Sequence, residues 1–406
     1  MARLLFAYDH LFHQTPDGVT YTMGGKLPYS KWEEYLAFFD EVTVVSRGVE
    51  ASADSVGTLA VSSGPKVTHS LLAGKRGFAR LATLGHHKAA LRPLVEGADA
   101  VIGRLPSEIG LSAINLAARM GKPYLIEMVG CPWDCLWNHG SPAGRIYAPI
   151  IMHRVRSAVR KAPLVHYVTR EFLQRRYPTQ GFTVSASNVV LPDHDPGIFA
   201  RREASVKAIG ARTRPVTFGT IGSMMTKLKG FDQALEAIAG LGREVPDFTY
   251  RILGEGSPER LRARAQELGI GDRVAFDGVI PGGPPVTKWL DGIDIYLQPS
   301  FQEGVPRAMI EAMNRGCLAI GSTAGGIPEL IPFNRMHRPG DAAGLRSCIV
   351  RMMGSSADDL AAEVERNVET ARGYSYERSL EQKNRIYSEL RGMADQKRLA
   401  EPSLSA

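Results

Sequence analysis

The sequence predicts an α/β protein made of two doubly wound domains with a cleft between them, and three observations lead to this prediction. At 406 residues the chain is too long for one ordinary hydrophobic core. Short β-branched or apolar runs alternate with longer amphipathic stretches from end to end, which is typical of parallel sheets covered by helices on both faces. The alternation forms two series, so we expect two such domains.

The first series lies in residues 1–190, the predicted N-terminal domain. Its strands are expected at residues 3–8, 41–46, 100–102, 123–129 and 164–168. The second series lies in residues 216–373, the predicted C-terminal domain. Its strands are expected at residues 216–221, 248–253, 274–276, 293–297 and 318–321. Because parallel sheets collect ligands at the carboxyl ends of their strands, the predicted site lies between the domains.

The remaining segments join and close the two domains. Residues 191–215 are predicted to form a linker, since prolines, aspartates and a glycine interrupt regular structure there. Residues 374–393 are predicted to form a C-terminal helix that packs back on the N-terminal domain. Residues 394–406 are expected to be a frayed tail.

Composition narrows the class of protein. With 44% hydrophobic and 22% charged residues the chain has the globular average, which excludes disordered, collagen-like and disulfide-framework classes. No run approaches 18 apolar residues and the first apolar run stops at Asp9, so neither a membrane span nor a signal sequence is expected. The four cysteines are scattered, and Cys131 and Cys135 lack a second pair at zinc-ligand spacing. We therefore expect a cytoplasmic protein without a metal site.

The formal net charge of +7 is concentrated in residues 145–176. This segment holds eight Lys and Arg residues against one Glu, a local charge of +7. The apolar residues that recur among them at helical spacing are Ile146, Ile150, Ile151, Val155 and Val159. Such a basic amphipathic helix either lies on an anionic membrane, here at its inner face, or forms an ordinary solvated helix face. No nucleic-acid-binding module is recognisable, so nucleic acid is not an expected partner.

The most informative segment is residues 297–313, where a buried strand, a polar loop and a helix follow one another. The helix is expected to begin at a turn formed by Gly304, Val305, Pro306 and Arg307. The fixed φ of Pro306 suits the first turn of a helix, whose free N–H groups bind anions such as phosphate. Glu303 and Glu311 flank this turn. Their carboxylates can accept hydrogen bonds from hydroxyls of sugars on either side of a diphosphate.

Two glycine-containing loops precede this segment. The first follows the predicted strand 216–221 and carries Gly222, Ser223, Lys227 and Lys229. A lysine in such a tight loop either binds a diphosphate or remains an ordinary surface residue. The second loop contains Gly254 and Gly256 as a G-x-G turn. It lacks the third glycine of the dinucleotide fingerprint, which argues against a redox cofactor.

Together these motifs resemble the donor half of glycosyltransferase family 4. The resemblance is carried by residues 222–230, the G-E-G-S turn, Gln298-Pro-Ser300, and E-G-V-P-R-A-M-I-E followed by G-G-I-P-E. It covers about residues 215–390 and implies the GT-B fold of two Rossmann-like domains. It also implies a retaining, metal-independent transferase that needs no cofactor and uses a UDP- or GDP-linked sugar as donor substrate.

The resemblance implies a role for each donor-site residue. Glu303 would contact the donor sugar as the catalytic carboxylate, and Glu311 would bind the nucleotide ribose. The turn of residues 304–307, through the backbone N–H groups of Gly304, Val305 and Arg307, would hold the diphosphate together with Lys229. The other donor-binding positions are Gly24, Gly25, Gly222, Ser223, Lys227, Gly254 and Val279.

The chain departs from the family pattern in two places. The family usually has an arginine at the position of Ser223, and Lys227 is the candidate substitute for its charge. Many members have a histidine after the strand predicted at 123–129, where this chain has Gly-Cys-Pro-Trp followed by Asp134. Asp134 is therefore the candidate catalytic contact to the acceptor hydroxyl or the sugar. A glycine-rich loop at residues 22–26 is expected close to the donor phosphates, with a plain loop as the alternative.

The predicted function is transfer of a hexose from a nucleotide diphosphate sugar to an acceptor hydroxyl, in polysaccharide or glycolipid assembly. The acceptor would be a glycan or a lipid-linked glycan. Retention with one sugar-contacting carboxylate favours front-face substitution, in which the leaving diphosphate takes the acceptor proton. Two alternatives stay open: a nucleotide-sugar epimerase of the same fold, and a catalytically silent protein that binds sugar nucleotides or acts as a scaffold.

Overall fold

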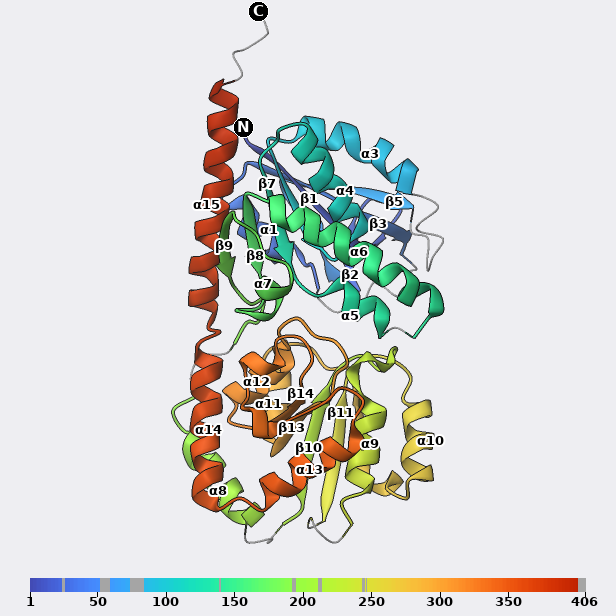
Figure 1. The fold of residues 1–406 in the computed structure, drawn as a ribbon, viewed down its shortest axis with the longest axis vertical. Helices are drawn as coiled ribbons and strands as arrows, with labels where there is room; N and C mark the ends of the chain where they lie inside the picture. The colour runs from blue at the N-terminus through green and yellow to red at the C-terminus, as the bar shows by residue number, and fades with distance from the viewer. Residues whose placement is uncertain are drawn as a thin grey trace, which may run out of the picture.

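Two α/β domains lie one above the other, and a long C-terminal helix runs along one side of the molecule (Figure 1). The structure is a computed structural model. It describes residues 1–23, 26–51, 59–73, 84–138, 140–191, 195–210, 214–242, 245 and 247–400. Within these residues each domain is built on a largely parallel sheet, which confirms the predicted fold class.

The N-terminal domain contains a nine-stranded sheet. Its strands are β1 (Arg3–Gln14), β2 (Thr20–Thr22), β3 (Glu41–Glu50), β4 (Ala60–Val61), β5 (Val67–Ala73), β6 (Ala100–Leu105), β7 (Tyr124–Met128), β8 (Leu164–Tyr167) and β9 (Phe182–Ser185). Seven of them run parallel in the order β5-β3-β1-β6-β7-β8-β9, while β2 pairs antiparallel with both β1 and β4. Strand β1 continues to Gln14, well past its predicted end at residue 8.

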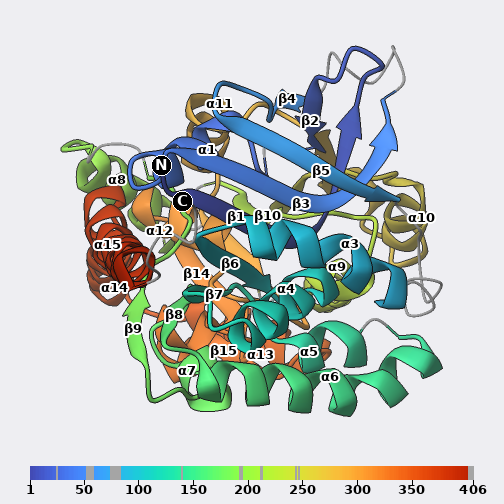
Figure 2. The ribbon, with the colours of Figure 1, turned by 90° about the horizontal axis from the view of Figure 1, so that it is seen from above.

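Helices cover both faces of this sheet. They are α1 (Tyr29–Leu36), α3 (Leu84–Gly97), α4 (Glu108–Arg119), α5 (Pro132–Trp137), α6 (Pro142–Lys161) and α7 (Phe172–Arg176). Successive side chains of a strand point to opposite faces, so Leu4 and Phe6 of β1 join the core under α1, whereas Leu5 and Ala7 join the core under α3, α4 and α6. Figure 2 shows α6 at the outer edge of the molecule, with α4 between it and the sheet.

The C-terminal domain contains a six-stranded parallel sheet in the order β12-β11-β10-β13-β14-β15. Its strands are β10 (Val216–Ile221), β11 (Phe248–Leu253), β12 (Val274–Gly278), β13 (Ile295–Gln298), β14 (Leu318–Ser322) and β15 (Met336–His337). Its helices are α8 (Ile198–Gly210), α9 (Phe231–Ala239), α10 (Glu259–Glu267), α11 (Pro284–Asp291), α12 (Arg307–Asn314), α13 (Ala342–Met353) and α14 (Ala357–Arg372). Short 3₁₀ turns include η3 (Lys227–Lys229) and η5 (Ile327–Glu329).

The predicted linker at residues 191–215 is too long. Helix α8 lies inside it, and Val206 and Ile209 of this helix are buried in the core of the C-terminal domain. Arg202 ties α8 to the same domain by donating hydrogen bonds to the carbonyl oxygens of Ile293 and Arg315 at 2.5 and 2.7 Å. Most of the segment therefore belongs to the C-terminal domain.

The last helix, α15 (Tyr376–Ala400), returns to the N-terminal domain. Its Tyr387 is buried there, and the hydroxyl donates a hydrogen bond of 3.0 Å to Glu127 of β7. The helix ends at Ala400 and not at residue 393 as predicted, because Ala394 is still buried against the N-terminal core. The predicted frayed tail is thus helical over 394–400, and residues 401–406 lie outside the described part of the chain.

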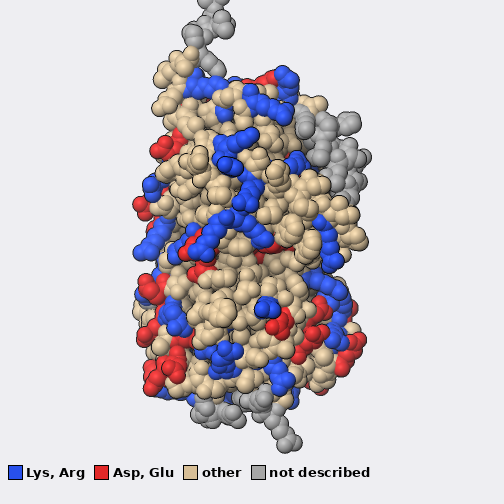
Figure 3. All heavy atoms as spheres, in the orientation of Figure 1, with Lys and Arg blue, Asp and Glu red and all other residues tan. Residues whose placement is uncertain are grey.

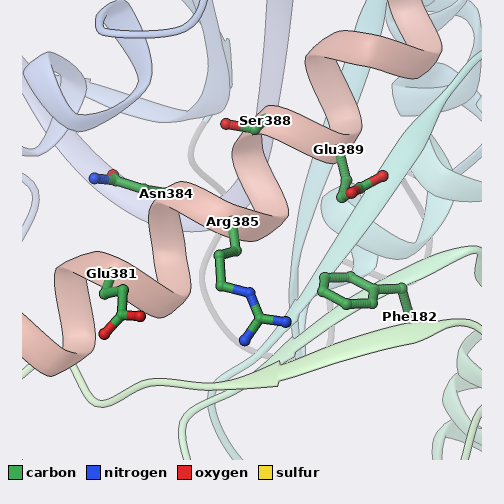
Figure 4. Close-up of a pocket in the computed structure, with 6 residues that line it drawn as sticks. All are labelled: Phe182, Glu381, Asn384, Arg385, Ser388 and Glu389. Atoms are coloured by element: carbon green, nitrogen blue, oxygen red, sulfur yellow. The ribbon is translucent and has the colours of Figure 1, made fainter.

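Helix α15 also packs against the edge strand β9 (Figure 4). The Arg385 guanidinium lies over the ring of Phe182, 5.6 Å from its centre. Glu381 and Glu389 stand on the same helix on either side of Arg385. The helix thereby protects a sheet edge whose free backbone groups would otherwise be open to pairing with another strand.

Candidate functional site

The two domains contact each other through the loops that follow their parallel strands. The Asn138 side chain, just after α5, donates a hydrogen bond of 2.9 Å to the carbonyl oxygen of Phe301 in the loop after β13. Gly304 comes so close to the residue after β7 that a Cβ atom on it would lie 2.6 Å from the carbonyl oxygen of Val129. Since the carboxyl ends of both sheets meet here, this interface is the place where a ligand of either sheet would bind.

Glu303 is anchored at this interface by three hydrogen bonds to one oxygen. Its Oε1 accepts from Lys229 Nζ at 2.6 Å, Ser300 Oγ at 2.7 Å and Gln298 Nε2 at 2.8 Å. The Glu303 side chain is buried, so these donors replace the water that a carboxylate needs. The side chain is therefore held in one orientation before any ligand binds.

The turn after Glu303 leads directly into α12. Pro306 occupies the position before the first helical residue, Arg307. The N–H groups of the first helical turn have no partner within the helix. They point outward from the N-terminal end of the helix, where the positive end of the helix dipole also lies. Gly304 and Val305 complete the turn, which thus offers a binding site for an anionic group beside Glu303.

Glu311 lies on α12, one turn after Arg307. Burial raises the pKa of the Glu311 carboxyl, and the positive charge of Arg307 opposes this effect. Glu303 and Glu311 both act on Tyr296 of β13, whose pKa is raised first by burial and further by these two negative charges. Tyr296 is the second residue of β13, and its hydroxyl accepts a hydrogen bond of 3.2 Å from the amide of Ile221 at the end of β10.

The two glycine loops pack directly against each other. A Cβ atom on Gly254 would lie 1.9 Å from the carbonyl oxygen of Gly222, and the φ of Gly254 is +153°. A Cβ atom on Gly222 would lie 2.9 Å from the Lys229 side chain. Only glycine permits this packing, which brings the ends of β10 and β11 together.

The other predicted donor-binding residues surround this contact. The Ser223 hydroxyl accepts a hydrogen bond of 3.4 Å from the amide of Met225. Lys227 of η3 is exposed, and Val279, directly after β12, is 72% exposed. These side chains are accessible at the same edge of the sheet, whereas the ammonium group of Lys229 is engaged by Glu303.

Gly24 and Gly25 lie outside the described residues. The neighbouring Lys26 is described, and its ammonium group lies 3.9 Å from a carboxylate oxygen of Glu255. Because Glu255 is the middle residue of the G-x-G turn after β11, this ion pair places Lys26 next to the predicted donor site.

Asp134 lies on α5 at the interface and is engaged in a salt bridge that was not predicted. Its two carboxylate oxygens accept hydrogen bonds of 3.0 and 2.9 Å from the same nitrogen of Arg176 on α7. Burial raises the pKa of the Asp134 carboxyl, and Arg176 opposes this effect. Arg176 thus engages both oxygens of Asp134, the residue predicted to contact the acceptor hydroxyl or the sugar.

Sequence reasoning missed two groups that shape this interface. Gln298 and Ser300 belong to a recognised motif, but only the structure shows that they hold Glu303. The Glu329 carboxylate in η5 accepts hydrogen bonds from the backbone amides of Arg170, Glu171 and Phe172 at 2.6, 3.1 and 2.8 Å. Phe172 is the first residue of α7, so these bonds link the two domains. No local signal in the sequence could have paired Glu329 with a helix about 160 residues away.

Metal-binding and membrane-spanning elements were also sought among the described residues. In that part of the chain no three or more His, Cys, Asp or Glu side chains are grouped so that they could hold a metal ion. All four cysteines are free thiols. Of the helices described, none is both long and apolar enough to cross a bilayer.

Comparison with known proteins gives the following relatives. Residues 215–355 match the family model described as glycosyl transferases group 1. Protein CapJ from Staphylococcus aureus is 27% identical over 356 residues, which cover 86% of each chain. The amylovoran biosynthesis glycosyltransferase AmsK from Erwinia amylovora is 33% identical over 144 residues, or 33% of this chain and 35% of its own. HepE from Anabaena, solved in complex with UDP and glucose, superimposes with a TM-score of 0.61 over 100% of both chains at 14% identity, a likeness of fold alone.

Proposed function

This chain belongs to the group 1 glycosyltransferases and has the GT-B fold, and on this basis we propose the reaction that it catalyses. It transfers a hexose from a nucleotide diphosphate sugar to a hydroxyl group of a glycan or lipid-linked glycan, with retention of configuration at the anomeric carbon. The complex of HepE with UDP supports a nucleotide sugar as donor. The name of AmsK supports a role in polysaccharide assembly.

The observation that carries this proposal is the arrangement around Glu303. A buried carboxylate, held through one oxygen, lies between a lysine and the N-terminus of α12. This combination matches the two unlike parts of a sugar diphosphate: the carboxylate accepts hydrogen bonds from sugar hydroxyls, and the helix amides bind phosphate oxygens. Glu311, one turn further into α12, would accept hydrogen bonds from the ribose.

Lys229 lies at the boundary between these two parts. Its ammonium group contacts the carboxylate that would bind the sugar, and η3 places it beside Gly222 of the first glycine loop. A diphosphate bound at the helix N-terminus would carry negative charge next to this ammonium group. Lys229 would then neutralise the charge of the diphosphate, and the Glu303 carboxylate would accept hydrogen bonds from hydroxyl groups of the sugar.

The proposed chemistry needs positioning and charge stabilisation more than a protein base. The bond from the anomeric carbon to the diphosphate oxygen breaks as the bond to the acceptor oxygen forms on the same face of the sugar. The departing diphosphate takes the acceptor proton, and its charge is stabilised by Lys229 and the backbone N–H groups of Gly304, Val305 and Arg307. Because these groups supply the positive charge, we propose that the reaction proceeds without a metal ion.

A panel of UDP- and GDP-hexoses tests this proposal. We expect one nucleotide sugar to raise the melting temperature and to release its nucleotide only when a glycan acceptor is added. The new linkage should show the anomeric configuration of the donor by NMR, and excess EDTA should leave the rate unchanged. Donor binding with no release would indicate a silent binder, and a changed sugar without acceptor would indicate an epimerase.

A further inference from the structure

Helix α6 presents an outward face on which apolar side chains are unusually exposed. Ile146 is 72% exposed and Ile150 50%, and Trp137, at the end of the preceding α5, is 43% exposed. The helix is fixed to the domain by its opposite side, where Ile151, Val155 and Val159 are buried. The five apolar residues that the sequence grouped together thus serve two different faces.

The same outward face is strongly basic. Its exposed cations are Arg145, Arg156, Arg160 and Lys161, and α6 contains no Asp or Glu. Other basic residues of the segment turn elsewhere: Arg154 forms a bidentate pair with Glu108 at 2.8 and 2.9 Å, and Arg176 is held by Asp134. Lys and Arg side chains gather on this side of the N-terminal domain with few acidic side chains among them (Figure 3).

The cations and the apolar side chains share one stripe of the helix. At 100° per residue, Arg145 and Arg156 lie on one flank of the exposed face, Arg160 and Ile146 lie near its centre, and Ile150 and Lys161 lie on the other flank. The Arg145 guanidinium is also 6.0 Å from the centre of the Trp137 ring, which extends the stripe onto α5. An aromatic ring, two isoleucines and four cations on one face form the combination that binds at the boundary between lipid headgroups and acyl chains.

We propose that this surface, the α6 face (Trp137, Arg145, Ile146, Ile150, Arg156, Arg160 and Lys161), docks the protein on an anionic lipid bilayer. Ile146, Ile150 and Trp137 enter the headgroup region, and the four cations contact lipid phosphates. Each Lys or Arg near such a surface adds about 1 kcal/mol, so the four charges are sufficient to favour anionic over neutral lipid.

The α6 face is continuous with the candidate site. Helix α5 ends at Trp137, and the next residue, Asn138, donates its hydrogen bond to Phe301 in the loop that carries Glu303. A bilayer on the α6 face would therefore lie beside the interface between the domains. This step rests on the proposed function: it identifies the acceptor as a lipid-linked glycan that reaches the site while its lipid stays in the membrane.

Vesicle co-sedimentation of the full-length chain tests the docking surface without any need for activity. The probes are phosphatidylcholine vesicles with and without phosphatidylglycerol. We expect binding to the anionic vesicles only, and about 100-fold weaker binding by the variant R156Q/R160Q/K161Q, since each charge contributes about fivefold. The variant I146S/I150S should bind about tenfold more weakly at the same charge.

The matched control is K288Q/R351Q/R378Q, which removes three exposed cations from α11, α13 and α15. It should bind the anionic vesicles within twofold of the wild type. Equal binding to both vesicle types, no binding at all, unchanged binding by the α6 variants, or an equal loss in the control would each overturn the proposal. The variant E303Q should bind vesicles like the wild type, so a failure of the catalytic proposal would leave this result intact.

Discussion

The substitution Gly304→Ala probes the contact between the two domains most sharply. The added methyl group would lie 2.6 Å from the carbonyl oxygen of Val129 and 3.2 Å from a methyl group of Val168, both in the N-terminal domain. To reach an ordinary contact of 3.4 Å, the interface must open by about 0.8 Å at this point. A misplacement of about 1 Å near reacting groups can cost about 100-fold in rate, so we expect kcat for transfer to fall tenfold to 100-fold.

The assay separates this effect from a loss of the donor site. The donor should still bind, because its predicted contacts lie mainly in the C-terminal domain, so the Kd for the nucleotide measured by calorimetry should stay within about threefold. The control is Gly392→Ala on α15, where an added Cβ meets nothing within 4 Å. Wild-type kcat in G304A, or an equal loss in G392A, would refute the argument that this close approach sets the catalytic geometry.

Three further predictions follow from individual contacts. Ser300→Ala removes one of the three donors to Glu303; a hydrogen bond to a charged group contributes about 1.5–3 kcal/mol, so kcat should fall about tenfold to 100-fold in the transfer assay, and an unchanged kcat would contradict this role. Glu311→Gln should raise the melting temperature at pH 7.5 by a few degrees. The folded-state pKa of Glu311 is raised, so its ionisation lowers stability as pH rises above 4.5; the gain should vanish near pH 4, and an equal gain at both pH values would refute this cause. Glu329→Ala should speed hydrogen exchange of the amides at residues 170–172, whereas Glu365→Ala on α14 should not; unchanged exchange in E329A would show that the interdomain cap is not required.

The strands that the sequence predicts most clearly are fully buried, and therefore consist of continuous runs of mostly apolar residues. β6 and β7 are buried at every position, so their apolar runs are unmistakable. The strands that were missed are short or lie near the sheet edges. Three of the four residues of β9 are exposed, and β5 contains Thr68, His69 and Ser70, so neither has a continuous apolar run. Their strand conformation depends on the neighbour with which they pair.

The candidate site likewise contains features that could be predicted from the local sequence and features that could not. The Pro306 turn and the glycine loops could be predicted because they are local: a fixed φ starts α12, and close packing at Gly254 requires a residue without a side chain. The support for Glu303 could not be predicted, since it joins η3 to the loop after β13 across 74 positions of the chain. The pairing of Asp134 with Arg176 likewise depends on how α5 and α7 pack, which no spacing in the sequence reports.

The transfer rate of Glu303→Gln tests the central claim most directly. Glutamine keeps the size of the side chain but removes the charge that Lys229, Gln298 and Ser300 surround. With the nucleotide sugar selected from the panel, we predict that E303Q binds the nucleotide within about threefold of the wild type and loses at least about 100-fold in kcat. The control E365Q, on the exposed side of α14, should retain full activity. Undiminished transfer by E303Q would contradict the assignment of this interface as the catalytic site.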